Sequence, residues 1–322
     1  MDLKNKTILL TGGVGSFGTK FVETVLKEHD PKVIRIYDIN ELGEVEMRRK
    51  FNDDRLRFLI GDVRDKRRLH RAMKGVDVVI HAAALKHIDV CEYNPIEAIR
   101  TNIEGAINVI DCAIDNNVEK VMAISTDKAA YPVNLYGATK MTAEKLFVQG
   151  NTYSGEEGTR FSCTRYGNVW GSSGSVIPLF KKQKEQGFVT ITDERMTRFW
   201  LTLEQGINFV IKSIERMEGG EIFVPKLKST KIIDLADIIA PEAEKRIIGI
   251  RPGEKLHEVL ITKEEARHTQ EIEDSFIVCP EFAFWKGNGI KDNKCIHEDF
   301  EYSSDKVESI TKEEIKELLE KL

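Results

Sequence analysis

The first 166 residues alternate short runs of β-branched and other apolar residues with longer segments that have the apolar spacing of a helix. Strands separated by helices of this length require right-handed crossover connections, which give a parallel sheet with helices on both faces. The predicted strands are Thr7–Thr11, Val33–Tyr37, Leu56–Ile60, Val76–Ala82, Lys120–Ser125 and Arg160–Tyr166, and the clearest predicted helices are Asn94–Asn116 and Leu135–Tyr153. We therefore expect an α/β fold built on a Rossmann-type doubly wound parallel sheet.

The pattern changes after Asn168, where short strand signals mix with helices and proline-marked turns. This change indicates a smaller C-terminal α/β domain that binds substrate. The predicted strands there are Val189–Ile191, Glu221–Val224 and Ile247–Ile250. We predict a nucleotide-binding domain over residues 1–168, to which later segments could return, and a substrate-binding region over residues 169–262.

Residues 263–322 form a polar tail, expected to serve as a lid or as an oligomer contact. Its last segment, Thr311–Leu322, has the pattern of an amphipathic helix. Thr311 is the predicted N-cap, and Glu314 stands at the spacing of a capping box.

Composition excludes several classes of protein. With 41% hydrophobic and 31% charged residues the chain is typical of a soluble globular protein, and its net charge of −5 disfavours nucleic acid as a partner. The longest mainly apolar run, Val76–Leu85, is too short to span a bilayer. Because no apolar leader precedes Thr7, we expect no export and a cytoplasmic protein. The five cysteines lack zinc-binding spacing, so reduced thiols and no metal site are expected.

A glycine-rich turn, Thr11–Gly18, directly follows the first predicted strand. Gly12, Gly15 and Gly18 are spaced three residues apart, and glycines there let the backbone approach a pyrophosphate at the positive end of a helix. The turn predicts a dinucleotide site that also uses Ser16 and Phe17. A tight turn needed only for packing is the alternative.

Asp38 ends the second predicted strand, 20 residues after Gly18, where a carboxylate can accept the ribose hydroxyls of NAD and repel the 2′-phosphate of NADP. An N-cap role for Asp38 is compatible with this one. NAD is favoured, and NADP stays open because Arg35 or Arg48 could supply a cation if the loop folds back. The other expected cofactor contacts follow later strands: Asp62, Val63, Ala82, Ala83, Ala84 and Tyr166.

Tyr136 and Lys140 stand four residues apart, on one face of a predicted helix. A phenol is a weak base at neutral pH, but a neighbouring ammonium and a positive nicotinamide ring favour the phenolate and bring its pKa into working range. Thr126, at the end of the fifth strand, could hydrogen-bond the reacting oxygen. These residues predict a base for chemistry beside a nicotinamide cofactor.

Asp127 and Lys128 follow the fifth strand, at the sheet edge where α/β proteins build active sites. Oxidation of a sugar at C4 acidifies the C5 proton, so a base at C5 and an acid at the C6 hydroxyl could eliminate water. Lys128 can be that base only if its pKa is lowered, and Asp127 can be that acid only if its pKa is raised. A surface ion pair or a helix-capping Asp127 is the alternative.

The motifs, taken together, resemble those of the UDP-N-acetylglucosamine 4,6-dehydratases, extended short-chain dehydrogenases/reductases related to polysaccharide and pseudaminic acid biosynthesis proteins. The resemblance runs from about Thr7 to about Thr262. The motifs are Thr11–Gly18, Gly61–Asp65, Ala82–His87, Ser125–Ala129, Asn134–Lys140, Arg165–Val169 and Asp193–Trp200. It implies UDP-N-acetylglucosamine as substrate, a 4-keto-6-deoxy product, a tightly held cofactor recycled in each turnover, and a homo-oligomer between dimer and hexamer.

By the same resemblance, Asp127 is the acid, Lys128 the C5 base, Tyr136 the base at C4, and Lys140 the residue that holds the cofactor ribose. The implied substrate contacts are Lys86, Asn168, Arg198, Arg251 and Glu254, the last two in the segment Arg251–Lys255. Relatives usually carry Ser-Arg where this chain has Asp38-Ile39, so their cofactor choice does not transfer. Members that retain the C5 configuration often have Met in place of Tyr136, which favours inversion here.

Two other readings stay open. A nucleotide-sugar 4-epimerase or a UDP-glucose 4,6-dehydratase would keep the glycine turn and the Tyr136–Lys140 pair, although an epimerase has no use for Asp127 and Lys128. A non-catalytic cofactor-sensing protein would need neither pair.

Overall fold

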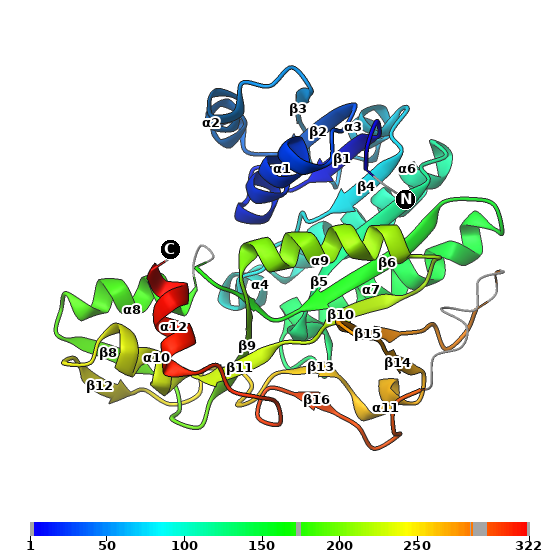
Figure 1. Cartoon of the computed structure of the whole chain (residues 1–322). Coiled ribbons are helices and arrows are strands. Elements are labelled where there is room, and N and C mark those ends of the chain that lie inside the picture. Colours follow the sequence, from blue (N-terminus) through cyan, green and yellow to red (C-terminus); the bar gives the residue numbers. More distant parts are fainter. Residues whose placement is uncertain (1–2, 172–174, 284, 286–294, 321–322) are drawn as a thin grey trace.

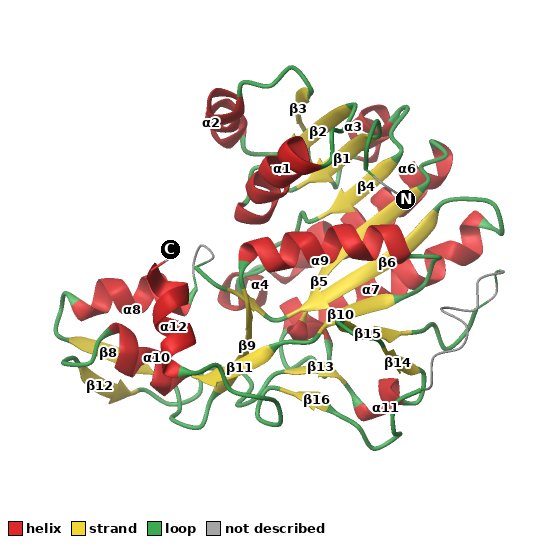
Figure 2. Cartoon of the chain, in the orientation of Figure 1, coloured by secondary structure: helices red, strands yellow, loops and turns green. Residues whose placement is uncertain are grey.

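The computed structural model describes residues 3–171, 175–283, 285 and 295–320, and its centre is a nine-stranded sheet with helices on both faces (Figures 1 and 2). In spatial order the strands are β14 (Thr269–Glu271), β15 (Ser275–Val278), β10 (Ile222–Pro225), β6 (Arg160–Tyr166), β5 (Lys120–Thr126), β4 (Val78–His81), β1 (Thr7–Thr11), β2 (Val33–Asp38) and β3 (Leu56–Ile60). Neighbours from β10 to β3 run parallel, whereas β15 and β14 are antiparallel additions at one edge. The predicted Rossmann-type α/β fold is confirmed.

Side chains of the central strands enter two different cores because successive residues point to opposite faces. Leu9 of β1 packs into one core, while Ile8 and Leu10 pack into the other. The first core lies under α3 (Lys66–Met73), α6 (Gly105–Asp115) and α7 (Leu135–Ser154), and the second under α1 (Ser16–Glu28), α2 (Glu41–Phe51) and α9 (Leu203–Arg216). Burial on both faces explains why Ile8–Leu10 of β1 and Val78–Ile80 of β4 are all apolar.

Two predicted elements differ from the structure. The helix expected over Asn94–Asn116 is interrupted: α4 (Ile88–Tyr93) is followed by α5 (Pro95–Ile99), a π-helical turn (Arg100–Glu104) and α6. The strand expected over Ile247–Ile250 is wrong, because the pairing residues are those of β12 (Glu244–Ile247), beside β8 (Phe188–Ile191). Gly249, with φ of +83°, turns the chain away from the strand.

A small lobe beside the main sheet has its own core (Figure 1). Its elements are α8 (Val176–Lys184), β8, β12, α10 (Ile232–Ile239) and α12 (Lys312–Glu320). A short sheet of β7 (Asn168–Val169), β9 (Thr197–Leu201) and β11 (Lys228–Lys231) lies between this lobe and the main sheet. Trp200 of β9 packs into the core of the lobe, whereas Phe199 packs into the main core, so β9 links the two bodies.

The C-terminal tail is divided between the two bodies. β14 and β15 extend the main sheet, β16 (Tyr302–Ser303) pairs with β13 (Val259–Ile261) beside α11 (Lys263–Ala266), and α12 packs in the small lobe. The predicted capping box is confirmed, since Glu314 N donates to Thr311 Oγ1 at 3.2 Å and Thr311 N donates to Glu314 Oε2 at 2.8 Å. Residues 321–322, which the predicted helix included, lie outside the described residues. The domain boundaries and the role of the tail as lid or oligomer contact stay predictions.

Among the described ranges, none of the helices combines the length and the apolar character that a membrane crossing requires.

Arg165 joins the sheet, α7 and the tail through an ion cluster in which Arg165 and Glu144 are buried and Glu265 is mostly buried. Its guanidinium donates to Glu144 Oε1 of α7 at 2.9 Å, to Glu265 Oε1 of α11 at 2.8 Å and to the Leu260 carbonyl at 2.9 Å. Each charge is paired, which is the condition under which buried ions are tolerated.

Arg165→Met is expected to lower the free energy of unfolding by about 3 kcal/mol, because it leaves Glu144 and Glu265 buried without their cation. Urea unfolding measures the change. Arg216→Met is the matched control. It removes an ion pair with Asp274, 2.9 Å long and more exposed, and should lower the free energy of unfolding by less than about 1 kcal/mol. If both variants lost the same free energy of unfolding, the buried ion cluster would not be what makes Arg165 stabilising.

Candidate active site

A cavity of about 950 Å³ opens at the carboxyl ends of the parallel strands, where open α/β sheets bind their ligands. Among its lining residues are nearly all the cofactor contacts predicted from the sequence: Gly12, Gly15, Ser16, Phe17, Asp38, Asp62, Val63, Ala82, Ala83, Ala84, Tyr136, Lys140 and Tyr166. Gly18 is the exception. A Cβ there would lie 2.2 Å from the Gly13 carbonyl oxygen, so this glycine serves the packing of the turn and does not line the cavity.

The glycine turn leads from β1 into α1 and faces the cavity with backbone. Gly12 has φ of +67°, and a Cβ on it would lie 2.8 Å from the Ala83 amide nitrogen, so only glycine allows the turn to approach the end of β4. Asp38, at the end of β2, accepts hydrogen bonds from Val14 N at 3.1 Å and Asn40 N at 3.0 Å. These contacts fix the carboxylate beside the turn, in the place a ribose-binding acid requires.

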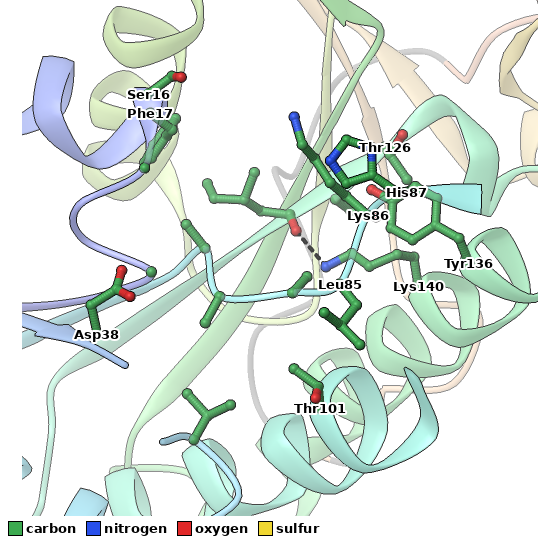
Figure 3. A pocket seen from close by; sticks show the side chains of 18 of the residues that line it. Ser16, Phe17, Asp38, Leu85, Lys86, His87, Thr101, Thr126, Tyr136 and Lys140 are labelled. Atoms are coloured by element: carbon green, nitrogen blue, oxygen red, sulfur yellow. Dashed lines mark hydrogen bonds between the residues drawn. The ribbon is translucent and has the colours of Figure 1, made fainter. Parts of the chain in front are cut away.

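The predicted catalytic side chains gather at the opposite side of the cavity. Figure 3 shows Ser16, Phe17 and Asp38 on one side and Thr126, Tyr136 and Lys140 on the other. Thr126 ends β5, and Tyr136 and Lys140 lie in the first turns of α7. Asp127 and Lys128 follow Thr126 in the 3₁₀ turn Asp127–Ala129.

Gly137 allows α7 to approach the 3₁₀ turn Asp127–Ala129 closely. A Cβ on Gly137 would lie 2.3 Å from the Lys128 carbonyl oxygen. The helix begins at Asn134, whose side chain accepts from Gly137 N at 2.7 Å and donates to the Gly253 carbonyl at 2.7 Å. The cap therefore also holds the segment 251–255 beside the site.

Lys140 is buried, and its Nζ donates to the Ile124 carbonyl of β5 at 2.7 Å (Figure 3). Burial lowers the pKa of Lys140. Burial raises the pKa of Tyr136 to about 12, although Lys128 and a hydrogen bond with Thr126 act in the opposite direction. The expected lowering of the phenol pKa is thus not met in the ligand-free protein, where the ring is desolvated and carries its proton at neutral pH.

The Asp127–Lys128 pair is enclosed at the same end of the cavity: the Asp127 side chain is 1% exposed and that of Lys128 is 21% exposed. Lys128 Nζ donates to Asp127 Oδ1 at 2.9 Å, and Thr126 Oγ1 donates to the same oxygen at 2.9 Å. Asp127 Oδ2 is buried and has no hydrogen-bond partner among the described residues. The alternative of a surface ion pair is wrong.

The condition for Lys128 to act as the base, a lowered pKa, is not met in the ligand-free protein. Burial acts to lower this pKa, but Asp127 and the unpredicted Glu258 outweigh burial and raise it above its ordinary value. Glu258 stands just before β13, and its Oε1 lies 3.4 Å from Lys128 Nζ.

The five expected substrate contacts fall into two groups. Lys86 and Asn168 line the cavity. Arg198, Arg251 and Glu254 do not: Arg251 is exposed, with Glu254 at 3.9 Å, and Arg198 is buried with its guanidinium donating to the carbonyls of residues 197, 255 and 256. In the ligand-free structure Arg198 thus binds backbone carbonyls outside the cavity, and its contact with the substrate stays a prediction.

Asn102, on the π-helical turn, is a second residue that the sequence analysis missed. Its side chain accepts from Leu85 N at 2.8 Å and donates to the Leu85 carbonyl at 2.9 Å and to Thr139 Oγ1 at 3.0 Å. The loop that carries Lys86 is thereby fixed to α7. A π-helical turn places one extra residue in the helix and often marks a functional site, a signal that periodicity does not reveal.

No group of three or more His, Cys, Asp and Glu side chains within the described ranges is placed to hold a metal ion.

The chain is similar to known proteins over most of its length. A family model described as "Polysaccharide biosynthesis protein" matches residues 8–280. A UDP-N-acetylglucosamine 4,6-dehydratase (inverting) of Campylobacter jejuni is 51% identical and covers 93% of this chain and 92% of that protein. A UDP-glucose 4-epimerase of Rickettsia conorii is 40% identical and covers 98% and 95% of the two chains.

The X-ray structure of Pen from Bacillus thuringiensis superposes with a TM-score of 0.92 at 38% identity, covering 100% of this chain and 99% of that one. Family match, sequence identity and fold agree, and they show that the chain belongs to the polysaccharide biosynthesis protein family and is a relative of the UDP-N-acetylglucosamine 4,6-dehydratases, as its motifs predict.

Proposed function

We propose that this protein is a UDP-N-acetylglucosamine 4,6-dehydratase that forms the UDP-4-keto-6-deoxy-N-acetylhexosamine with inversion at C5. The observation that carries the proposal is the enclosure of Asp127 and Lys128 beside Tyr136 and Lys140 in one cavity. A side chain of each type that elimination requires, acid and base, lies there next to a pair suited to hydride transfer. The name of the relative at 51% identity supports the same activity.

The proposed roles follow from the positions of the side chains. A bound nicotinamide cofactor supplies the acceptor of hydride from C4 and its donor to C6. Tyr136 takes the proton of the C4 hydroxyl, Lys128 takes the C5 proton, and Asp127 gives a proton to the C6 hydroxyl, which leaves as water. As hydride adds at C6, C5 regains a proton from solvent on the opposite face of the ring, which gives the inverted product. Lys86 and Asn168 contact the substrate from the cavity wall.

NAD is the proposed cofactor. Asp38 holds a carboxylate at the ribose position, and Ile39 beside it is 68% exposed and uncharged. The cations that could have favoured NADP are engaged elsewhere, because Arg35 donates to the carbonyls of residues 72 and 74 and Arg48 stacks over the Phe58 ring. The negative charge of a 2′-phosphate would therefore face Asp38, and neither Arg35 nor Arg48 would neutralise it.

Asp38→Ser combined with Ile39→Arg is expected to change the ratio of the NAD and NADP dissociation constants by about tenfold to a hundredfold toward NADP, since hydrogen bonds to charged groups contribute about 1.5–3 kcal/mol. Titration of the cofactor-free protein with each dinucleotide measures this ratio. Leu42→Arg adds the same charge at a side chain of similar exposure, 67%, and should leave the ratio unchanged. If the double variant left this ratio unchanged, residues other than Asp38 and Ile39 would determine which cofactor binds.

Incubation with UDP-N-acetylglucosamine followed by mass spectrometry tests the proposed activity. Dehydration removes the mass of one water, whereas 4-epimerisation, the activity named for the 40% identical relative, leaves the mass unchanged. NMR of the product formed in deuterium oxide gives the configuration and the deuterium content at C5. A product of unchanged mass would overturn the dehydratase and favour the epimerase.

A cytoplasmic location and a homo-oligomer between dimer and hexamer are part of the proposal. Exposed apolar side chains on α4 and α5, Tyr93, Ile96 and Ile99, support contact between subunits.

A further inference from the structure

Three cationic side chains, Lys128, Arg198 and Lys255, surround Glu258 next to the turn Asp127–Ala129. Glu258 is 2% exposed. Its Oε1 lies 3.4 Å from Lys128 Nζ and 3.8 Å from Arg198 Nε, and its Oε2 lies 3.0 Å from Lys255 Nζ. A carboxylate this deeply buried is tolerated only because cations surround it.

Lys255 ties this cluster to the turn, since its Nζ also donates to the Ala130 carbonyl at 2.8 Å and to the Asp127 carbonyl at 3.4 Å. The segment 255–258 therefore supports the turn in two ways, through the backbone by Lys255 and through the Lys128 side chain by Glu258. The sequence gives Glu258 no role, and neither elimination nor hydride transfer uses it directly.

Lys128 is held between two carboxylates, Asp127 Oδ1 at 2.9 Å and Glu258 Oε1 at 3.4 Å. Burial acts to raise the pKa of Glu258, but Lys128, Arg198 and Lys255 outweigh burial and lower it to about 2, so its charge persists at every working pH. The charged and titratable groups that face Lys128 are Asp127, Glu258, Arg198 and Tyr136. Of these, only Asp127 and Glu258 favour the ammonium form.

An ammonium cannot take a proton from a substrate, so Lys128 must lose one before it acts as a base. Transfer of one proton from Lys128 Nζ to Asp127 Oδ1, across their 2.9 Å hydrogen bond, leaves a neutral amine and a neutral carboxylic acid. These are the two forms that elimination requires, and no proton is exchanged with solvent. The negative charge of Glu258 opposes this transfer, because it stabilises the ammonium and not the amine.

We propose that Glu258 is a positioning residue for the base: it holds Lys128 as an ammonium ion beside Asp127 in the resting enzyme and opposes the proton transfer to Asp127 that frees the amine. This inference rests on the proposed function, in which Lys128 removes the C5 proton. Arg198 and Lys255 act through Glu258, since they keep its charge in place beneath the turn.

Glu258→Gln tests the proposal, because glutamine keeps the shape and an acceptor oxygen but removes the charge. The first readout is labelling of Lys128 by acetic anhydride in the ligand-free protein, followed by mass spectrometry across a pH series, since only the amine reacts. The labelling curve is expected to move about two pH units toward acid, as loss of an opposite charge at this distance shifts a pKa by about 1–3 units. At a fixed pH on the rising limb, each unit means about tenfold faster labelling.

The second readout is exchange of the substrate C5 proton with deuterium oxide, whose rate at a given pH should rise in Glu258→Gln because the charge that opposes the proton transfer is gone. Glu258→Asp withdraws the charge without removing it, so it should give a smaller shift of the same sign. Glu308→Gln, which removes an exposed carboxylate paired with Lys228 at 2.8 Å, is the control and should shift neither curve. The unfolding midpoint of each variant checks that the protein is folded.

Curves of Glu258→Gln that coincide with the wild type, in labelling or in exchange, would overturn the proposal. So would a folded variant that still reduces its cofactor but exchanges no C5 proton at any pH. A wild-type protein that releases no water refutes the proposed function instead, and the labelling curves then still decide whether Glu258 holds Lys128.

Discussion

Lys128→Ala is expected to stop the loss of water while the protein still binds its cofactor and oxidises C4. General base catalysis contributes about 10²–10⁴ in rate, and Lys128 lines the cavity and donates to the Asp127 side chain, so the rate of water loss should fall about 10³–10⁴-fold. Tyr136 and Lys140 belong to α7 and keep their positions without the Lys128 side chain. The variant should therefore retain reduced nicotinamide after substrate is added.

Mass spectrometry of the nucleotide sugar measures the water loss, and absorbance of the reduced nicotinamide measures the oxidation at C4. Lys182→Ala removes an exposed lysine of α8 and should change neither quantity. Normal water loss from Lys128→Ala would remove Lys128 from the mechanism. Loss of both reactions together would instead indicate that the alanine disturbs the turn and the start of α7.

The parallel core was predictable from sequence because its strands are buried on both faces. Thr7–Thr11 and Arg160–Tyr166 match β1 and β6 at both ends. Exposed and short strands carry no such signal. β14 is three residues long with an exposed glutamate at its end, and β12 exposes most of its side chains, so neither pattern separates strand from loop.

The site was predictable where its residues stand at the ends of strands. Thr126, Asp127 and Asp38 follow directly from that rule, since the carboxyl ends of parallel strands share one edge of the sheet. The protonation state of Lys128 was not predictable in the same way. Glu258 reaches Lys128 from a distant segment, and together with Asp127 it outweighs burial and raises the Lys128 pKa. Only the folded chain reveals which carboxylate lies beside which cation.

Tyr136→Phe is expected to block the reaction at its first step, the oxidation of C4. Phenylalanine fills the same buried space and removes only the hydroxyl, so the loss reports the proton acceptor and not the packing. The rate of nicotinamide reduction should fall about 10³-fold. Because burial raises the pKa of Tyr136 to about 12, the wild-type rate should rise with pH as the phenolate becomes populated, and this rise should be absent from the variant.

Stopped-flow absorbance of the nicotinamide over a pH series, with cofactor and UDP-N-acetylglucosamine present, measures both effects. Tyr153→Phe is the matched control, since Tyr153 lies on the same helix, is 77% exposed and does not line the cavity. Reduction by Tyr136→Phe at the rate of this control would mean that another group takes the C4 proton. Thr126 and His87, which line the same end of the cavity, would then be the residues to replace, because each could exchange a proton with a sugar hydroxyl there.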